Sequence, residues 1–143
     1  MLRRGYTRET AIRRDRRGRW CNGEERIEHP GVARSFDGWI ERAADGRWCL
    51  RNDINWAYVA IEGPPYFVRG VRLAPDALPV LLLSGDHEEP LDPETLRMDA
   101  ADALWCDVRG GLPARFDPHA QQGLAELVDE DEQGVVLRLA GAA

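Results

Sequence analysis

The sequence predicts an α+β fold in which two tandem repeats each supply an antiparallel β hairpin, one helix and a return strand, forming a mostly antiparallel sheet or barrel. A Trp-Cys pair occurs twice, at Trp20-Cys21 and Trp105-Cys106. A proline follows each pair, with three more residues intervening in the second copy, and a turn glycine follows each proline at the same distance of 16 residues; further β-prone runs lie in the middle of the chain, within the first repeat. This similarity predicts an internal duplication.

The first repeat, residues 10–84, is expected to contain a helix that begins at Pro30. Proline fits the first helical position, where its missing N–H costs nothing, although His29 is a weak capping residue. Four apolar residues follow at spacings that place them on one face of a helix. They are Val32, Phe36, Trp39 and Ile40.

The second repeat, residues 95–143, begins with an expected strand at Leu104–Val108. Alternation along this strand turns Leu104, Cys106 and Val108 to one side. A helix is expected from Pro118, with Asp117 as its cap. Its apolar positions match those of the first helix one for one: Ala120, Leu124, Leu127 and Val128.

The middle of the chain predicts further strands. Residues 55–62 and 66–73 read as two strands joined at a Gly-Pro-Pro turn, and "PVLLLSG" reads as a buried strand. Residues 85–94 are expected to be a linker loop, and residues 1–9 an N-terminal arm. Trp56 and Tyr58 share one face of their strand, where they could stack on a planar ligand; packing in the core is the alternative.

Composition indicates a globular protein of the cytoplasm. Hydrophobic residues make up 43% and charged residues 31% of the 143 positions. The longest apolar run, "LPVLLL", is far short of a membrane span, and the arginine-rich start lacks the apolar segment of a secretory signal. We therefore expect no membrane partner.

Charge is divided along the chain. Residues 1–51 hold 13 arginines against 8 acids, and the rest hold 6 arginines against 17 acids. The stretch "RRDRRGRW" could contact a phosphate backbone, but the acidic remainder would repel nucleic acid. Arginines paired with the protein's own acids are the preferred interpretation, and nucleic acid is disfavoured as a partner.

Three cysteines, an odd number, indicate reduced thiols rather than a disulfide framework. Cys106, in a Trp-Cys pair near a glycine turn, invites interpretation as a nucleophile. A side chain that faces the core would instead have a raised pKa and be inert. The equivalent position of Cys21 favours this structural role.

Arg109, Gly110 and Gly111 form the candidate anion site. Two glycines permit positive φ and can direct successive N–H groups toward an anion, and the arginine adds charge. The alternative is a turn at the end of a strand, with Arg109 paired to a carboxylate. The "DHEE" run contains possible metal ligands at no recognised spacing, so no metal, cofactor or catalytic set is predicted.

The order of "RRGRWCNGEERIEHP", "AADGRWCLRNDINWAYVAIEGPPYF" and "LWCDVRGGLPARFDP" resembles the bacterial domain-of-unknown-function family 1285, over residues 12–139. The matching positions are Trp20, Gly23, Ile27, Leu50, Pro65, Arg109, Gly110, Gly111, Leu112 and Ala114. The resemblance implies a duplicated α+β core, a pleckstrin-homology-like C-terminal half, and a cleft between the halves that binds a nucleotide-like ligand in signalling. It implies no enzymatic activity.

The chain departs from the family pattern at two places. Residues 52–56, Asn-Asp-Ile-Asn-Trp, stand where the family usually has a Thr-Pro-x-Glu-Lys run, and Gly63 stands where it usually has an aspartate. We expect a non-enzymatic binding or sensory module for a small anionic or nucleotide-like ligand. Arg109, Gly110 and Gly111 would hold the anion, with Trp56 or Tyr58 as the planar contact. The alternatives are a protein-interaction module without a small-molecule ligand, and a hydrolase.

Overall fold

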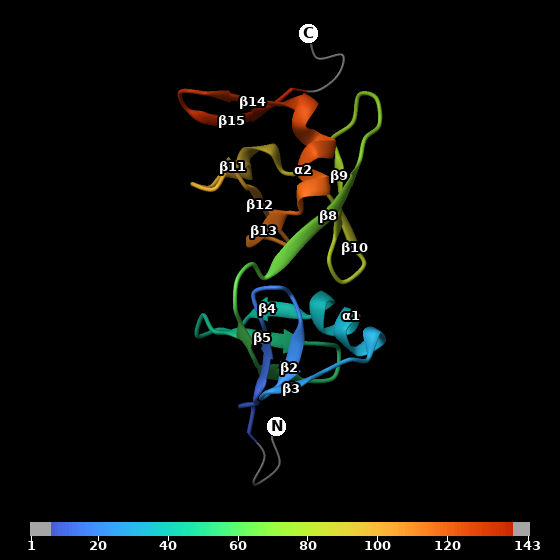
Figure 1. Ribbon diagram of the computed structural model, residues 1–143, viewed down its shortest axis with the longest axis vertical. Helices are drawn as coiled ribbons and strands as arrows, with labels where there is room; N and C mark the ends of the chain where they lie inside the picture. The colour runs from blue at the N-terminus through green and yellow to red at the C-terminus, as the bar shows by residue number, and fades with distance from the viewer. Residues whose placement is uncertain (1–6, 139–143) are drawn as a thin grey trace. The chain divides into compact units, whose positions relative to one another are not determined.

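A computed structural model describes residues 7–138, which form two compact units that divide after Pro65 (Figure 1). Residues 1–6 of the predicted N-terminal arm lie outside the described residues. The predicted first repeat, residues 10–84, spans the division between the units. The predicted Gly-Pro-Pro turn leads from the last strand of one unit to the first strand of the next, and these two strands belong to different sheets.

The N-terminal unit contains two sheets and one helix. The four-stranded sheet has the order β3-β2-β1-β7, in which only the β1–β7 pairing is parallel. The second sheet, β4-β5-β6, is antiparallel. The elements are β1 (Ile12–Arg14), β2 (Trp20–Asn22), β3 (Glu25–Arg26), α1 (Pro30–Gly38), β4 (Ile40–Arg42), β5 (Trp48–Arg51), β6 (Trp56–Tyr58) and β7 (Ala60–Ile61).

Helix α1 begins at Pro30 as predicted, and His29 caps it. The Nδ1 atom of His29 accepts hydrogen bonds from the N–H groups of Gly31 at 3.1 Å and Val32 at 3.3 Å. The expected cap Asp117 makes no such bond to α2, because its carboxylate binds Arg69 at 3.0 Å. The relative capping strengths predicted from the sequence are therefore wrong.

Replacing His29 by alanine should lower the free energy of unfolding by about 1 kcal/mol, because two N–H groups of the first turn lose their acceptor. The Asp117→Ala variant should cost less, since Asp117 forms an exposed ion pair instead of a cap. Chemical denaturation of both variants measures the difference. An equal or reversed order would show that the imidazole cap does not contribute.

Both helices end earlier than the apolar pattern predicts. Helix α1 stops at Gly38, so Ile40 lies in β4, where it is buried. Helix α2 gives way at Ala125–Leu127 to a short 3₁₀ turn, η2, and Val128 begins a strand. The Asp-Gly step disfavours a third turn in α1, and β-branched Val128 suits the strand it enters.

The C-terminal unit contains a six-stranded sheet of order β10-β9-β8-β13-β12-β11 and a separate β14–β15 hairpin. Only β8 and β13 pair in parallel within the larger sheet, and α2 packs along β8 (Figure 1). The elements are β8 (Tyr66–Arg72), β9 (Val80–Leu83), β10 (His87–Pro90), η1 (Pro93–Thr95), β11 (Arg97–Met98), β12 (Leu104–Val108), β13 (Leu112–Phe116), α2 (Pro118–Leu124), η2 (Ala125–Leu127), β14 (Val128–Asp131) and β15 (Gly134–Leu137).

The predicted linker at residues 85–94 is instead structured, which corrects the loop expected there. Residues 87–90 pair with β9, and Gly85 and Asp86 make the tight turn with φ values of 82° and 59°. A polar sequence can form this strand because β10 lies at the sheet edge, where charged side chains reach solvent. The strands predicted around residues 66–73, 79–85 and 104–108 are confirmed.

The predicted α+β class with mostly antiparallel sheets is confirmed. Both units contain a hairpin, then a helix, then a second hairpin, with Trp20 in β2 and Trp105 in β12. The sheets around these elements differ in strand number and order. The internal duplication therefore stays a prediction. Between residues 7 and 138, every helix is too short or too polar to cross a bilayer.

Candidate functional site

The turn between β12 and β13 contains the predicted anion-binding residues. Arg109, Gly110 and Gly111 all have positive φ, at 50°, 80° and 133°, as the glycine pair suggested. The Arg109 N–H donates to the Glu89 carboxylate at 2.9 Å, and the Gly111 N–H donates to the Val108 carbonyl at 3.1 Å. An internal carboxylate therefore lies where an external anion was expected.

The Arg109 guanidinium is also engaged, since it donates to the Tyr66 hydroxyl and lies 5.4 Å from the centre of that ring. A second residue, His87, contacts Glu89 through its Nε2 atom at 3.1 Å. An incoming anion at this turn would have to displace Glu89. The anion-binding role of these three residues stays a prediction.

Trp56 and Tyr58 lie together on β6, with ring centres 5.1 Å apart in an edge-to-face arrangement. Arginines already cover both rings: Arg8 lies 4.1 Å from the centre of Trp56, and Arg47 lies 3.6 Å from that of Tyr58. A planar ligand would have to displace a guanidinium from either ring. The stacking role predicted for this pair stays a prediction.

Polar contacts fix the same aromatic face in place. The Tyr58 hydroxyl donates to Asp45 at 2.7 Å, a bond that raises the pKa of Tyr58 and lowers the pKa of Asp45. Arg47 forms two bonds with Glu9, at 2.7 and 2.8 Å. The polar and charged side chains around Trp56 and Tyr58 therefore bind one another within the N-terminal unit.

Cys106 occupies the core of the C-terminal unit. Its side chain is fully buried on β12 between Leu104 and Val108, so the predicted alternation is confirmed. Burial raises the pKa of the Cys106 thiol to about 12. At neutral pH almost none of this cysteine is ionised to the thiolate, so it is a poor nucleophile.

Histidine and acidic side chains do not converge on a metal position within residues 7–138: no group of three or more His, Cys, Asp or Glu side chains there could hold an ion. In the "DHEE" run, Glu88 pairs with Arg72 at 2.7 Å, and Glu89 contacts His87 and Arg109. These carboxylates therefore bind neighbouring residues of the sheet.

An open hollow of about 390 Å³ lies in the N-terminal unit, between the β1–β2 turn, β3 and the start of α1. We call it the N-terminal hollow. It is lined by Gly18, Arg19, Trp20, Arg26, Ile27, Glu28, Pro30 and Ala33. Its volume falls within the range typical of small-molecule sites.

Two arginines supply positive charge to this hollow. Arg19 donates through Nε to Asp15 at 2.8 Å, and its terminal NH₂ groups make no bond to any residue between 7 and 138. Arg26 is exposed and forms no ion pair within the same range. Arginine presents a planar set of donors that suits phosphate, and both residues retain donors for a ligand.

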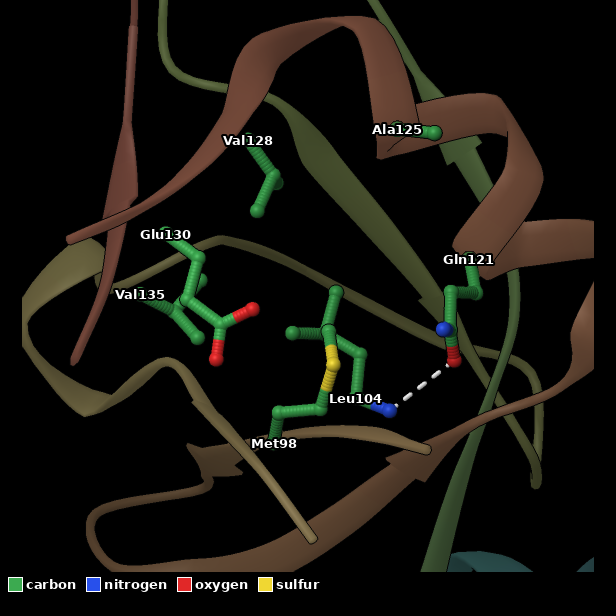
Figure 2. A pocket seen from close by; sticks show the side chains of 7 residues that line it. All are labelled: Met98, Leu104, Gln121, Ala125, Val128, Glu130 and Val135. Atoms are coloured by element: carbon green, nitrogen blue, oxygen red, sulfur yellow. Dashed lines mark hydrogen bonds between the residues drawn. The ribbon is translucent and has the colours of Figure 1, made fainter. Parts of the chain in front are cut away.

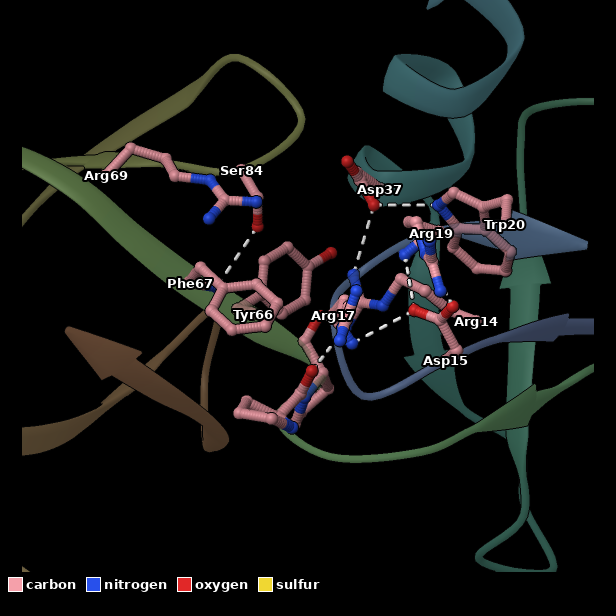
Figure 3. A network of polar contacts seen from close by, with 12 residues as sticks. Arg14, Asp15, Arg17, Arg19, Trp20, Asp37, Tyr66, Phe67, Arg69 and Ser84 are labelled. Atoms are coloured by element: carbon pink, nitrogen blue, oxygen red, sulfur yellow. Dashed lines mark hydrogen bonds and ion pairs between the residues drawn. The ribbon is translucent and has the colours of Figure 1, made fainter. Parts of the chain in front are cut away.

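A buried ion pair supports the strands beside the hollow (Figure 3). One oxygen of Asp37, at the end of α1, accepts from Arg14 at 3.0 Å and from the Trp20 indole N–H at 2.8 Å. Arg14 also donates to the carbonyl groups of Pro64 and Pro65. The pair thus links α1, β1 and β2 and fixes the position of Trp20.

The sequence suggested a phosphate contact for the basic stretch that contains Arg19, but pairing with the protein's own acids was the preferred interpretation. Arg26 was also missed, because it lies on β3 outside that stretch. The relevant signal was an excess of arginine in residues 1–51 over the acids available to pair with it. Only the folded β1–β2–β3 and α1 arrangement shows which arginines border a hollow.

The fold is similar to those of two solved structures. A DUF1285 family protein from Silicibacter pomeroyi matches with a TM-score of 0.72 and 19% identity, covering 94% of this chain and 78% of that protein. A DUF1285 family protein from Shewanella baltica matches with a TM-score of 0.60 and 14% identity, covering 78% of this chain and 87% of that protein. No protein-family model and no curated protein matches the sequence.

The predicted resemblance is therefore confirmed at the level of the fold: this chain has a DUF1285-like α+β fold. At sequence identities of 19% and 14%, the similarity covers the arrangement of the backbone and not the side chains of a site. Function has to be argued from the side chains of this chain.

Proposed function

We propose that the protein is a non-enzymatic binding module and that the N-terminal hollow takes a small nucleotide-like anion. The observation that carries the proposal is the pair of arginines, Arg19 and Arg26, on an open hollow of about 390 Å³. Both have donors left for a ligand within the described chain. A phosphate bound there would exchange water for charge-assisted hydrogen bonds.

The rest of the lining suits the other parts of a nucleotide. Glu28 offers a carboxylate that can accept hydrogen bonds from ribose hydroxyl groups, a role acidic residues play in many nucleotide sites. Ile27, Pro30 and Ala33 supply apolar surface for a base. The carboxylate also disfavours a bare, highly charged anion, which directs the preference toward a phosphate that carries a sugar.

The burial and the contacts of the cysteines and histidines support the proposal that the module is not an enzyme. The three cysteines are all buried. Of the three histidines, His29 holds the start of α1 and His87 contacts Glu89, so these two imidazoles have structural partners. Neither arrangement provides the exposed nucleophile and adjacent base that covalent catalysis requires.

Adenosine 5′-monophosphate is the probe for this site, with adenosine as the uncharged comparison. Calorimetric titration at low ionic strength should show binding of the monophosphate and much weaker binding of adenosine. The Arg26→Ala variant should bind the monophosphate at least about tenfold more weakly, because each charge-assisted hydrogen bond contributes about 1.5–3 kcal/mol.

Arg42→Ala is the matched control. Arg42 is an exposed arginine of the same unit that lies over Trp48 and does not line the hollow. Its removal changes the net charge equally and should alter affinity less than twofold. Equal losses in both variants would indicate nonspecific attraction, and absence of binding to the unaltered protein would contradict the proposal.

A further inference from the structure

A second pocket, of about 200 Å³, lies within the C-terminal unit (Figure 2). We call it the C-terminal pocket. Five of its lining residues are apolar: Met98, Leu104, Ala125, Val128 and Val135. They come from β11, β12, η2 and both strands of the β14–β15 hairpin. The pocket therefore depends on the position of a hairpin that is separate from the main sheet.

The hairpin turns one mostly apolar face to this pocket. In the antiparallel register Val128 lies opposite Leu137 and Glu130 lies opposite Val135, so these four residues share a face. The other face contains Asp129, whose carboxylate pairs with Arg138 at 2.6 Å. Glu130 is thus the one charged residue among the four on the pocket face.

Glu130 is a charged residue on a hairpin face whose other members, Val128, Val135 and Leu137, are apolar. Figure 2 shows its carboxyl group directed into the pocket, on the same side as Met98. Within residues 7–138 no basic side chain pairs with it. A carboxylate in this position favours a ligand that brings its own positive charge.

The second polar residue of the lining has a structural role. The side-chain oxygen of Gln121 accepts from the Leu104 N–H at 2.9 Å, and its NH₂ group donates to the Asp102 carbonyl at 2.8 Å. Gln121 therefore joins α2 to the sheet, and both the oxygen and the NH₂ group of its side chain already have partners within the unit. This leaves Glu130 to set the charge of the ligand.

We propose that the C-terminal pocket binds a small protonated amine with an apolar body, held by Glu130 at its charged end. The volume corresponds to about seven water molecules, and an apolar cavity of roughly 150 Å³ in another protein accepts benzene. One aromatic ring with a short aminoalkyl chain fits this space. Met98, with its flexible thioether, can adapt to the shape of the ring.

Binding would also stabilise the hairpin. Strand β15 packs against β11 and η1, but neither β14 nor β15 joins the six-stranded sheet. A two-stranded hairpin is only marginally stable by itself, so a ligand that touches both strands and α2 would slow the hydrogen exchange of its amides.

The test uses the full chain, labelled with ¹⁵N, and three probes of similar size: 2-phenylethylamine, 2-phenylethanol and 3-phenylpropionate. The amine should shift the amide signals of Met98, Val128 and Val135 and bind at least about tenfold more tightly than the alcohol. The carboxylate should bind most weakly. Equal affinities for the amine and the alcohol would overturn the proposal, as would shifts confined to other residues or no binding.

Glu130→Gln keeps the shape of the side chain and should reduce amine affinity to that of the alcohol. Glu132→Gln is the matched control, because Glu132 lies in the turn of the same hairpin and does not line the pocket. It should leave the preference for the amine unchanged. If Glu130→Gln does not fold, the three probes on the unaltered chain still decide the question.

This site is independent of the N-terminal hollow. The probes carry no phosphate and the lining residues belong to the other unit. Failure of the amine to bind would leave the nucleotide proposal standing, and the converse also holds.

Discussion

The Asp37→Ala variant should lose about 3–5 kcal/mol of unfolding free energy, because it leaves the Arg14 charge buried without its carboxylate. The Arg14 side chain is 1% exposed and that of Asp37 is 18% exposed. The same substitution removes the acceptor of the Trp20 indole N–H. Four of the five tryptophans lie in the N-terminal unit, so tryptophan fluorescence during urea unfolding measures this loss.

Glu62→Ala is the control for this prediction. Glu62 pairs with Arg13 at 3.4 Å, with both side chains at least 37% exposed, and exposed pairs contribute at most about 1 kcal/mol. A loss for Asp37→Ala no larger than that for Glu62→Ala would contradict the structural role of the buried pair.

Thiol reagents should hardly modify the native protein. A pKa of about 12 leaves Cys106 roughly a thousandfold less thiolate at neutral pH than an exposed cysteine has. Burial also raises the pKa of Cys49. Ellman's reagent should therefore detect far less than one thiol per chain in minutes, and all three cysteines after denaturation.

Mass spectrometry of the modified protein identifies which cysteine reacts. Fast modification of Cys106 in the native state would contradict its place in the core and restore the nucleophile hypothesis. Slow modification whose rate keeps increasing with pH up to about 11 is the expected behaviour, because the thiolate fraction increases over that whole range.

Local patterns predicted much of the fold. Both helices begin at their prolines, and the strand at residues 104–108 buries alternate side chains as expected. These features depend on residues that are close together in the sequence, so local patterns reveal them. Pairings between distant segments leave no local pattern: the parallel pairs β1–β7 and β8–β13 join residues almost 50 apart in the chain.

The candidate sites were harder to predict, because they depend on which charges find partners. Arg109 and Tyr58 carry chemistry that suits a ligand, yet Glu89 and Asp45 bind them within the protein. Arginine is rarely buried, so no sequence pattern distinguishes Arg14 from its exposed neighbours. The pocket around Glu130 follows from a hairpin register that the strand pattern alone does not specify.

The most direct test of the proposed function is an amide chemical-shift titration of the ¹⁵N-labelled chain with adenosine 5′-monophosphate. The proposal predicts saturable shifts concentrated in residues 18–33, around Arg19 and Arg26, and their loss in Arg26→Ala. Saturable shifts concentrated instead at Trp56 to Tyr58 and Arg109 to Gly111, or no shifts at all, would contradict it.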